Sequence, residues 1–327
     1  MKRQFLKYRR LVLVGVFLAG ALAIDQGFGV LLKRVLPQVK KGQNVGLVNV
    51  ALDHSEADIF IFGSSRAQHH IMPAVLTKEL GCSAFNAGCN GQGILYHHIL
   101  ARLMLARDSN TRLFILNVDP GSFYVPQYQR ALVLAPYLEE DPVVRELIVC
   151  AAEPYGEFKA HSSTWRFNSI ALPIVLRALS SNPEPDTDGF VPLFGDFKEI
   201  KPREANAKFY DDVVERHRQF IRDARNHGVA VVFVVGPCFD RDHSYPKGMD
   251  TIAKLAREED VSVLYLDERE YPVFCDKAYY RDRGHLNAEG AEKLTQLLAK
   301  QLKKQKILLP KSGKPDLPQS AVEDHLP

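Results

Sequence analysis

The stretch "DIFIFGSSRAQHH", residues 58–70, runs from an apolar segment directly into Gly63-Ser64-Ser65-Arg66. The four apolar residues Ile59–Phe62 predict a short buried strand. A serine that follows such a strand and precedes a helix can lie on a tight turn, with its hydroxyl exposed at the edge of a sheet. Gly-Ser-Ser is equally typical of an ordinary turn and helix cap, so the stretch alone leaves both interpretations open.

Apolar runs and helical patterns alternate along most of the chain. The predicted strands are Ile59–Phe62, about Ser83–Asn86, Leu113–Val118, Val229–Val235 and Val261–Leu266, and the predicted helices are about Pro73–Leu80, Leu95–Arg107, Ala207–Asn226, Met249–Glu259 and Ala288–Lys304. This alternation predicts a three-layer α/β/α fold with a five-stranded parallel sheet, of the flavodoxin-like type. Sites in such sheets lie beyond the carboxyl ends of the strands. The segments expected along that edge are Gly63–Arg66, Ala87–Gly93, Asn117–Ser122 and Gly236–Asp240.

The N-terminus is basic and then apolar. Its first ten residues include five basic side chains and no acidic one, and Leu11–Ile24 is uncharged. That segment would span about 21 Å as a helix, short of the bilayer core of about 30 Å, but a helix that continues to Leu32 is long enough. We expect residues 1–35 to form a cytoplasmic basic tip and an uncleaved transmembrane anchor, with the main domain extracytoplasmic. Cleavage of a signal peptide after Ala23, which would release a secreted protein, is the alternative, and a buried helix of a soluble protein is the third.

The rest of the chain divides by composition. Residues 36–308 hold the α/β pattern, and residues 120–206 interrupt it with many aromatic side chains and the turn-rich "SSNPEPDTDGF". We expect this insertion to place helices and loops over the active edge, either as a lid or substrate platform or as simple packing on the sheet. Residues 309–327 are polar and contain prolines, so the tail is predicted to be disordered.

Charge and cysteine content narrow the classes of function. The net charge of +3 gives no support for nucleic-acid binding. The five cysteines form no CxxC pair and are odd in number, which leaves room for at most partial pairing. Neighbouring histidines, as in His69-His70 and His97-His98, do not share a helix face and make poor metal sites. We expect neither a metal nor a cofactor.

A second polar element stands near the C-terminus, in "YYRDRGHLNAEGAEKL", residues 279–294. Asp282 and His285 are three residues apart in a predicted loop before the last helix. This spacing lets the carboxylate accept from the imidazole Nδ1–H while Nε2 faces a nucleophile. The alternative is a solvated loop in which Asn287 caps the helix.

Taken together, "GSSRAQHHIMP" and "DRGHLNAEGAEKL" resemble the opening and closing motifs of the SGNH (GDSL-like) hydrolase superfamily. The match is closest to its membrane-anchored branch, which includes proteins of cell-wall D-alanylation and polysaccharide O-acetylation. The similarity covers about Asp58–Leu302, with residues 120–206 variable in such families. It implies an SGNH-type fold and an extracytoplasmic serine esterase or O-acyltransferase that acts through an acyl-enzyme. Its partners would be an ester or acylated envelope glycan and envelope-polysaccharide machinery.

The resemblance also implies roles for individual residues. Ser65 matches the nucleophile, His285 the general base and Asp282 the residue that orients the base. Gly88 in "FNAGCNGQG" matches the glycine whose N–H contributes to the oxyanion hole. Asn90, beside it, and Arg66, after the nucleophile, are further candidates for contact with the turn or the substrate.

The third motif departs from the family pattern. Many members place an Asn side chain in the oxyanion hole after the third strand, but this strand ends "LNVDP", with Asp119 at that position and Asn117 two residues earlier. An ionised Asp119 would oppose an oxyanion. Either Asn117 serves, or Asp119 points elsewhere, or backbone donors act alone. The departure favours the alternative function, a non-catalytic carbohydrate-binding or assembly protein on the same fold.

Overall fold

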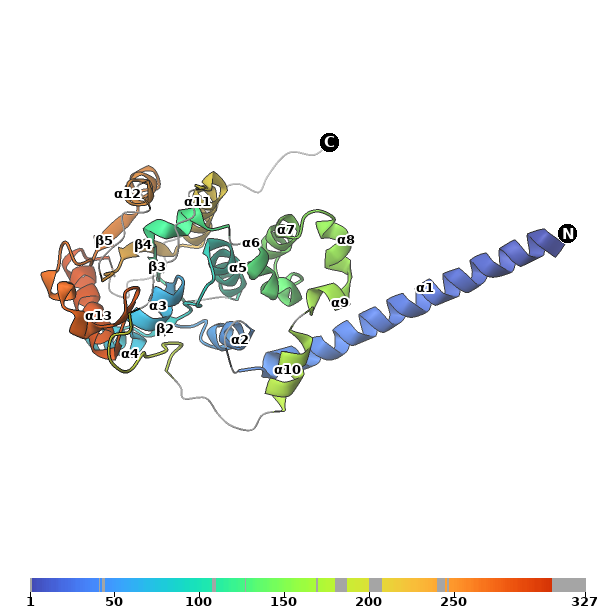
Figure 1. Cartoon of the computed structure of the whole chain (residues 1–327), viewed down its shortest axis with the longest axis horizontal. Coiled ribbons are helices and arrows are strands. Elements are labelled where there is room, and N and C mark those ends of the chain that lie inside the picture. Colours follow the sequence, from blue (N-terminus) through green and yellow to red (C-terminus); the bar gives the residue numbers. More distant parts are fainter. Residues whose placement is uncertain are drawn as a thin grey trace.

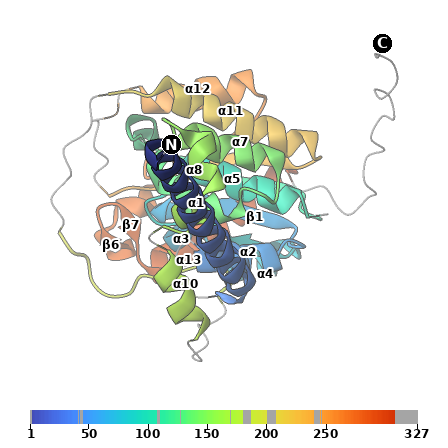
Figure 2. The same cartoon turned by 90° about the vertical axis from the view of Figure 1, so that its right-hand side faces the viewer.

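A parallel sheet of five strands, in the order β2-β1-β3-β4-β5, lies between two layers of helices (Figure 2). The computed structural model describes residues 2–40, 42, 45–107, 110–126, 128–168, 170–179, 187–199, 208–239, 245 and 247–307. The strands are β1 (Ile59–Phe62), β2 (Ala84–Asn86), β3 (Leu113–Asn117), β4 (Ala230–Val235) and β5 (Ser262–Tyr265). The predicted three-layer α/β/α fold with a five-stranded parallel sheet is therefore confirmed.

Alternate residues of the strands enter two separate cores. Phe60 and Phe62 pack in the core that includes α2 (Val45–Asp53), α5 (Ile94–Leu105), α11 (Asp211–Asn226) and α12 (Gly248–Glu258). Ile59 and Ile61 pack in the opposite core, with α3 (Ser65–His70), α4 (Pro73–Leu80) and α13 (Ala288–Lys304). Because both faces are covered, most strand residues are apolar on both faces, which is why β1, β3 and β4 appear in the sequence as nearly continuous apolar runs.

Most predicted elements differ from the structure only at their ends. The helices predicted at Pro73–Leu80 and Ala288–Lys304 match α4 and α13, because each has a clear terminal signal. Gly81, with φ of +67°, ends α4, and the Asn287 side chain accepts from the Gly290 N–H at 3.0 Å to begin α13. Ala207, the predicted start of α11, lies outside the described residues.

Two elements were not predicted. Helix α2 precedes the sheet. The segment with Asp282 and His285, predicted as a loop, is instead a small antiparallel hairpin of β6 (Tyr280–Asp282) and β7 (His285–Leu286), which follows η4 (Pro272–Cys275) and η5 (Lys277–Tyr279). Strands this short give no alternating pattern long enough to recognise.

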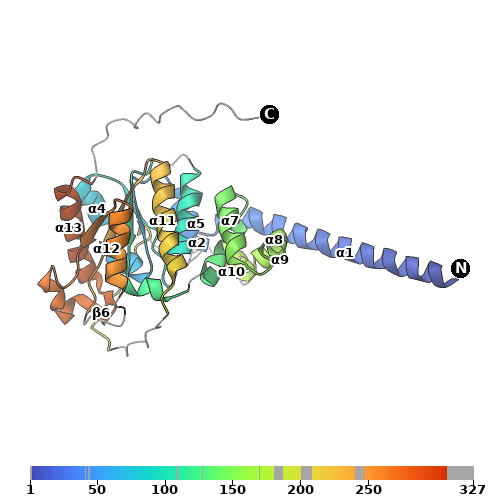
Figure 3. The ribbon, with the colours of Figure 1, turned by 90° about the horizontal axis from the view of Figure 1, so that it is seen from above.

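Within the described residues one helical segment, Tyr8–Gln38, is long and apolar enough to cross a membrane. It consists of most of α1 (Lys2–Val35) and of η1 (Leu36–Gln38). Helix α1 leaves the domain as a single projecting rod (Figures 1 and 3). Length and composition thus fit a signal anchor or a single membrane span.

The insertion after β3 has two parts. Most of its helices lie between α5 and the projecting part of α1 (Figure 3), and the contacts of α7 with α5 and of α9 and α10 with α1 agree with this view. They are α6 (Tyr128–Ala131), η3 (Leu132–Tyr137), α7 (Pro142–Ala151), α8 (Gly156–His161), α9 (Ser163–Arg166) and α10 (Ala171–Ala178). The first helix of the insertion, η2 (Pro120–Tyr124), lies apart from these and contacts α11 and α12. The extended segment 187–199 follows them along α3 and the hairpin. The tail predicted to be disordered, 309–327, lies outside the described residues.

Several histidines are buried in the cores. Burial lowers the pKa of His97 from its ordinary value of 6.5 to about 3, and His217 adds to this shift. Burial also lowers the pKa of His217 to about 4. Between pH 6.5 and these values the unfolded chain binds protons that the folded chain does not. Stability is therefore fully present above pH 6.5 and falls as the pH drops below it.

We predict that the free energy of unfolding falls by about 1.4 kcal/mol per pH unit for each such histidine below its unfolded pKa. Replacing His97 with Phe, which keeps the ring beside Phe62 and Tyr96, removes one of these protons and makes the dependence shallower. Urea unfolding of both chains between about pH 5 and about pH 8 measures it. Equal pH slopes for the two chains would contradict the prediction.

Candidate active site

The sequence stretch that follows β1 forms a sharp strand-to-helix turn at the carboxyl edge of the sheet. Gly63 adopts φ of +138°, which side chains disfavour. A Cβ atom at this position would lie 2.8 Å from the Asn117 carbonyl oxygen and 2.9 Å from the Ala67 Cβ. Only glycine therefore allows this turn, after which Ser65 is the first residue of α3.

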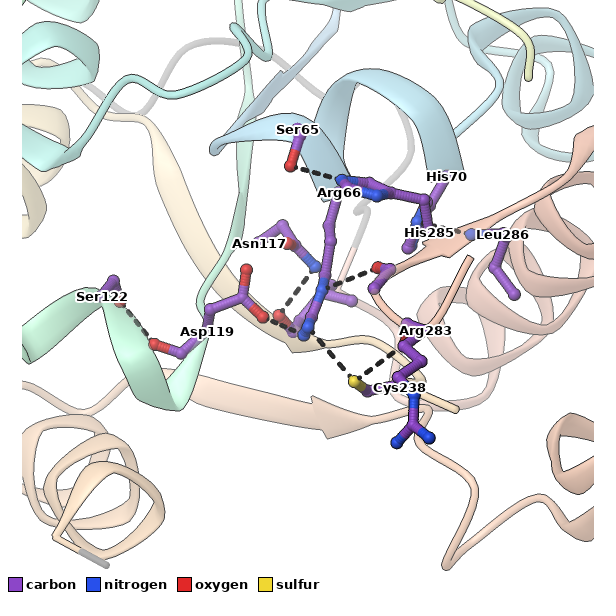
Figure 4. A network of polar contacts seen from close by, with 12 residues as sticks. Ser65, Arg66, His70, Asn117, Asp119, Ser122, Cys238, Arg283, His285 and Leu286 are labelled. Carbon is purple, nitrogen blue, oxygen red and sulfur yellow. Dashed lines mark hydrogen bonds and ion pairs between the residues drawn. The ribbon is translucent and has the colours of Figure 1, made fainter. Parts of the chain in front are cut away.

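The two serines of the turn have different partners. The Ser64 Oγ accepts from the Gly91 N–H at 3.2 Å, so Ser64 ties the turn to the loop after β2. The Ser65 Oγ lies 2.8 Å from His285 Nε2 (Figure 4). The structure thus places Ser65, and not Ser64, against the histidine.

Asp282 lies on the other side of the imidazole. The His285 Nδ1 is 2.9 Å from Asp282 Oδ1 and 3.1 Å from Oδ2. The same carboxylate accepts from the backbone N–H groups of Gly284, at 2.8 Å, and His285, at 3.0 Å. Burial opposes the charge of Asp282, but these hydrogen bonds and the nearby imidazole lower its pKa below the ordinary value of 3.8. An ionised Asp282 fixes the tautomer with the proton on Nδ1 and leaves Nε2 free to accept from Ser65.

The two histidines that follow the turn lie beside His285. His70 is buried, and its Nε2 accepts from the Leu286 N–H at 2.9 Å, which joins α3 to β7. The His69 Nδ1 donates to the Val191 carbonyl at 2.7 Å. The rings of both approach that of His285 edge-on, at centroid distances of 5.8 and 6.1 Å. Neither histidine was predicted to lie near the site. The available signal was the polar run that directly follows the turn.

Arg66 lies beneath the turn and contacts three other segments (Figure 4). Its Nε donates to the Gly284 carbonyl at 3.1 Å, and its Nη2 donates to Cys238 Sγ at 3.4 Å. Its Nη1 forms an ion pair with Asp119. Burial opposes the charge of Arg66, but the attraction of Asp119, followed by that of Cys238, raises the pKa of the guanidinium above its usual range. The Asp119 carboxylate is thus turned toward a cation.

Asn117, the other candidate at the end of β3, is also engaged. Its Nδ2 donates to the Val234 carbonyl at 3.3 Å, across to β4. Its Oδ1 is buried and has no hydrogen-bond partner among the described residues. In this conformation the Asn117 side chain links the carboxyl ends of β3 and β4.

The loop after β2 is tied down through its backbone. The Gly88 N–H, which the family resemblance assigns to the oxyanion hole, donates to Asn86 Oδ1 at 2.9 Å. Four neighbouring N–H groups are also bonded: Ala87 to the Ile61 carbonyl, Cys89 to the Gly63 carbonyl, Asn90 to Gln68 Oε1 and Gly91 to Ser64 Oγ. Asn90 itself is exposed. The Ser65 N–H remains as a donor, because the first N–H groups of a helix have no partner within it.

The described residues contain no group of three or more His, Cys, Asp or Glu side chains arranged to hold a metal ion. None of the five cysteines forms a disulfide. A cavity of about 330 Å³ lies at the base of α1, lined by residues that include Lys33, Asn49 and Tyr137. None of Ser65, Asp282 and His285 lines it; these three side chains are half-buried at the sheet edge.

No protein-family model matches the chain, and no curated protein matches its sequence. Among solved structures it is similar to an acetyl xylan esterase, AlAXEase, with 13% identity, a TM-score of 0.39, and coverage of 76% of this chain and 98% of that one. A presumed acylhydrolase from Bacteroides fragilis NCTC 9343 has 10% identity, a TM-score of 0.38, and coverage of 76% of this chain and 88% of that one. Similarity at this level leaves the activity to be argued from the site itself.

We predict that Arg66→Met lowers the free energy of unfolding by about 3 kcal/mol, because it leaves the half-buried Asp119 without its cation. The Arg66→Met/Asp119→Asn chain should recover part of this loss, since no unpaired charge remains. Urea unfolding of the wild type, both single variants and the double variant forms the required cycle. Strictly additive losses would show that the pair is not coupled.

Proposed function

We propose that the chain is a membrane-anchored, SGNH-like serine esterase or O-acyltransferase. The observation that carries the proposal is the continuous hydrogen-bonded series from Ser65 Oγ to His285 Nε2, at 2.8 Å, and from His285 Nδ1 to Asp282, at 2.9 Å. A serine hydroxyl needs an adjacent base to become a nucleophile, and the base needs a third group to orient it. The three residues have the types and the order that this chemistry requires.

In the first half of the reaction, His285 Nε2 takes the proton of the Ser65 hydroxyl as Oγ attacks the ester carbonyl. The resulting oxyanion lies beside the N-terminus of α3, where the Ser65 N–H is the available donor. The imidazolium then gives its proton to the oxygen of the leaving alcohol, and the C–O bond to that oxygen breaks. Ser65 is left acylated, and His285 is neutral again.

In the second half, water or a sugar hydroxyl gives its proton to His285 and attacks the acyl carbon. The proton returns to Ser65 Oγ as the bond between Oγ and the acyl group breaks. Hydrolysis and transfer therefore share every residue and differ in the acceptor. Resemblance to the membrane-anchored branch favours an acylated cell-envelope glycan as substrate and an extracytoplasmic position beside envelope-polysaccharide machinery.

The segment 187–199 offers a place for part of the substrate. Its Val191 N–H donates to the Gln68 carbonyl, and its Leu193 carbonyl accepts from the Ala288 N–H, so it follows α3 and the start of α13. Directly after the second anchor, Phe194 is 71% exposed, which is unusual for a large aromatic side chain. Aromatic side chains of this kind bind the apolar faces of sugars and acyl groups.

A non-catalytic, carbohydrate-binding or assembly role on the same fold is the second candidate. The observations in its favour are the engaged donors, because the Gly88 N–H is bonded to Asn86 and the Asn117 Nδ2 to Val234. An oxyanion hole that uses Gly88 requires that its N–H exchange this bond for one to the substrate.

We predict that an activated fluorophosphonate labels the full-length chain in detergent and that Ser65→Ala abolishes the labelling. Ser64→Ala is the matched control and should keep it, because the Ser64 hydroxyl is bonded to Gly91 and not to His285. Circular dichroism checks that each variant is folded. A folded wild-type chain without label would favour the binding role, and labelling that survives Ser65→Ala would reject this nucleophile.

We further predict that Phe194→Ala raises KM for an aryl acetate several-fold and leaves kcat nearly unchanged, since Phe194 has no part in the proton transfers. Leu172→Ala, at an exposed position of α10, is the control and should change neither constant. Steady-state hydrolysis of the three chains provides the measurement. A fall in kcat with unchanged KM would argue against a substrate-binding role.

A further inference from the structure

The exposed part of α1 ends where α9 begins. Asp25 accepts from the backbone N–H groups of Ser163, at 2.8 Å, and Thr164, at 2.7 Å, and so caps α9. One turn later, a Cβ atom at Gly29 would lie 2.2 Å from the Ser163 Oγ, which means that the two helices are in close contact. Every residue from Tyr8 to Ile24 is exposed, so this part of α1 is free of the domain, and its uncharged stretch is Leu11–Ile24.

That free part is short for a membrane span. Tyr8–Ile24 corresponds to about 25 Å of helix, and the uncharged Leu11–Ile24 to about 21 Å, against a bilayer core of about 30 Å. The remaining thickness of about 5 to 10 Å would fall at the level of Asp25 and beyond. There α1 is flanked by α8, α9 and α10, which we call the collar (Figures 1 and 3).

The collar is unusually apolar on its outer surface. Of the ten large hydrophobic side chains that are exposed outside α1 in the described part of the chain, six lie in α8 and α10 or at their cap residues Tyr155 and Leu179, which we include in the collar. They are Tyr155, Phe158, Leu172, Val175, Leu176 and Leu179. Phe158 is 80% exposed and Leu179 is 79% exposed, so these side chains are not at the margin of the core. Burying such a side chain completely is worth about 1.5 to 3 kcal/mol relative to leaving it in water.

Helix α10 is apolar on two faces. Ile174 points inward and is buried in the core, as the amphipathic helix of a soluble domain requires. The outer face carries Leu172, Val175, Leu176 and Leu179, at the spacing i, i+3, i+4 and i+7 of a helical stripe. A second apolar stripe needs a second apolar surface to cover it.

Charges at the contact between α1 and the collar are paired. Glu139 forms ion pairs with Lys33 and with Arg166. Asp25 is satisfied by the α9 N-terminus, and Gln26 donates to the His161 carbonyl at 3.0 Å. Because these groups already have partners, this region can approach a headgroup layer without leaving an isolated charge.

We propose that the collar is a bilayer-docking surface, whose exposed side chains enter the outer leaflet around the base of α1. The proposal rests on α1 crossing the membrane. The bilayer is the occupant because α10, which carries the stripe, packs against the base of α1, the helix that would enter the membrane. Interfacial helices enter to about 5 to 10 Å, which is the thickness that α1 alone lacks. Docking would hold the domain on the membrane instead of letting it swing on a single helix.

The single tryptophan, Trp165, makes this surface measurable. In a Trp165→Phe background, Phe158→Trp or Leu176→Trp places the fluorophore on the collar. Val273→Trp is the matched control, because Val273 is exposed in η4, whose N-cap residue Tyr271 accepts from Gln301 of α13. Helix α13 lies at the opposite end of the domain from α1 in Figure 1. The full-length chains are placed in phosphatidylcholine nanodiscs, with or without lipid brominated near the glycerol end of one acyl chain.

We expect the Phe158→Trp and Leu176→Trp chains to lose about half of their fluorescence in brominated lipid, in keeping with a depth of about 5 to 10 Å. Lipid brominated near the methyl end should quench less, and the Val273→Trp chain should not be quenched. Collar tryptophans that brominated lipid leaves unquenched but aqueous acrylamide quenches would overturn the proposal. Protection from both quenchers would also overturn it, since a second copy or the domain itself would then cover the face.

Alkaline carbonate extraction separates the collar from the anchor. If a chain resists carbonate extraction but brominated lipid does not quench its collar tryptophan, docking is rejected and the anchor is retained. A chain released by carbonate would reject docking and the anchor together. Circular dichroism confirms that each variant is folded.

Discussion

The candidate site depends on one buried guanidinium. Arg66 follows Ser65 directly and binds the Gly284 carbonyl, Cys238 and Asp119, which come from the hairpin and from the loops after β4 and β3. These segments are far apart in the sequence, and the sheet only brings their ends to a common edge. Arg66 sets their distances at that edge, because its planar group has donors in fixed directions. The 2.8 Å contact between Ser65 and His285 follows from this arrangement.

The ion pair with Arg66 changes the effect expected of the Asp119 carboxylate. By motif position it faced the oxyanion, where a negative charge would oppose the reaction. In the structure it neutralises Arg66, and the pair lies half-buried beside the site as a neutral unit. The oxyanion then has the N-terminus of α3 nearby, where the Ser65 N–H and the helix dipole both favour negative charge. In the proposed reaction, the rate would depend on how readily the Gly88 N–H leaves Asn86 for the oxyanion.

The sheet and its flanking helices could be predicted from the sequence because they rest on local signals. Apolar runs defined the strands, and Gly81 and Asn287 marked helix ends. The α2 helix and the hairpin of β6 and β7 were not predicted, since neither shows a long periodic pattern. The contacts between particular side chains could not be predicted, for a different reason. The contact of Arg66 with Asp119 spans 53 residues, and that of His70 with Leu286 spans 216, so only the folded chain selects them.

The surroundings of His285 also bear on its proposed work as a base. His69 and His70 lie beside its ring, at centroid distances of 5.8 and 6.1 Å. Burial, followed for His70 by the nearby His285, lowers the pKa of both, so they stay neutral when His285 takes a proton. Two cations there would have repelled the imidazolium that acyl transfer requires. The neutral rings therefore lie beside His285 without opposing its charge, and that of His70 also bonds the backbone of β7. The ionised Asp282 then stabilises the charge of the imidazolium.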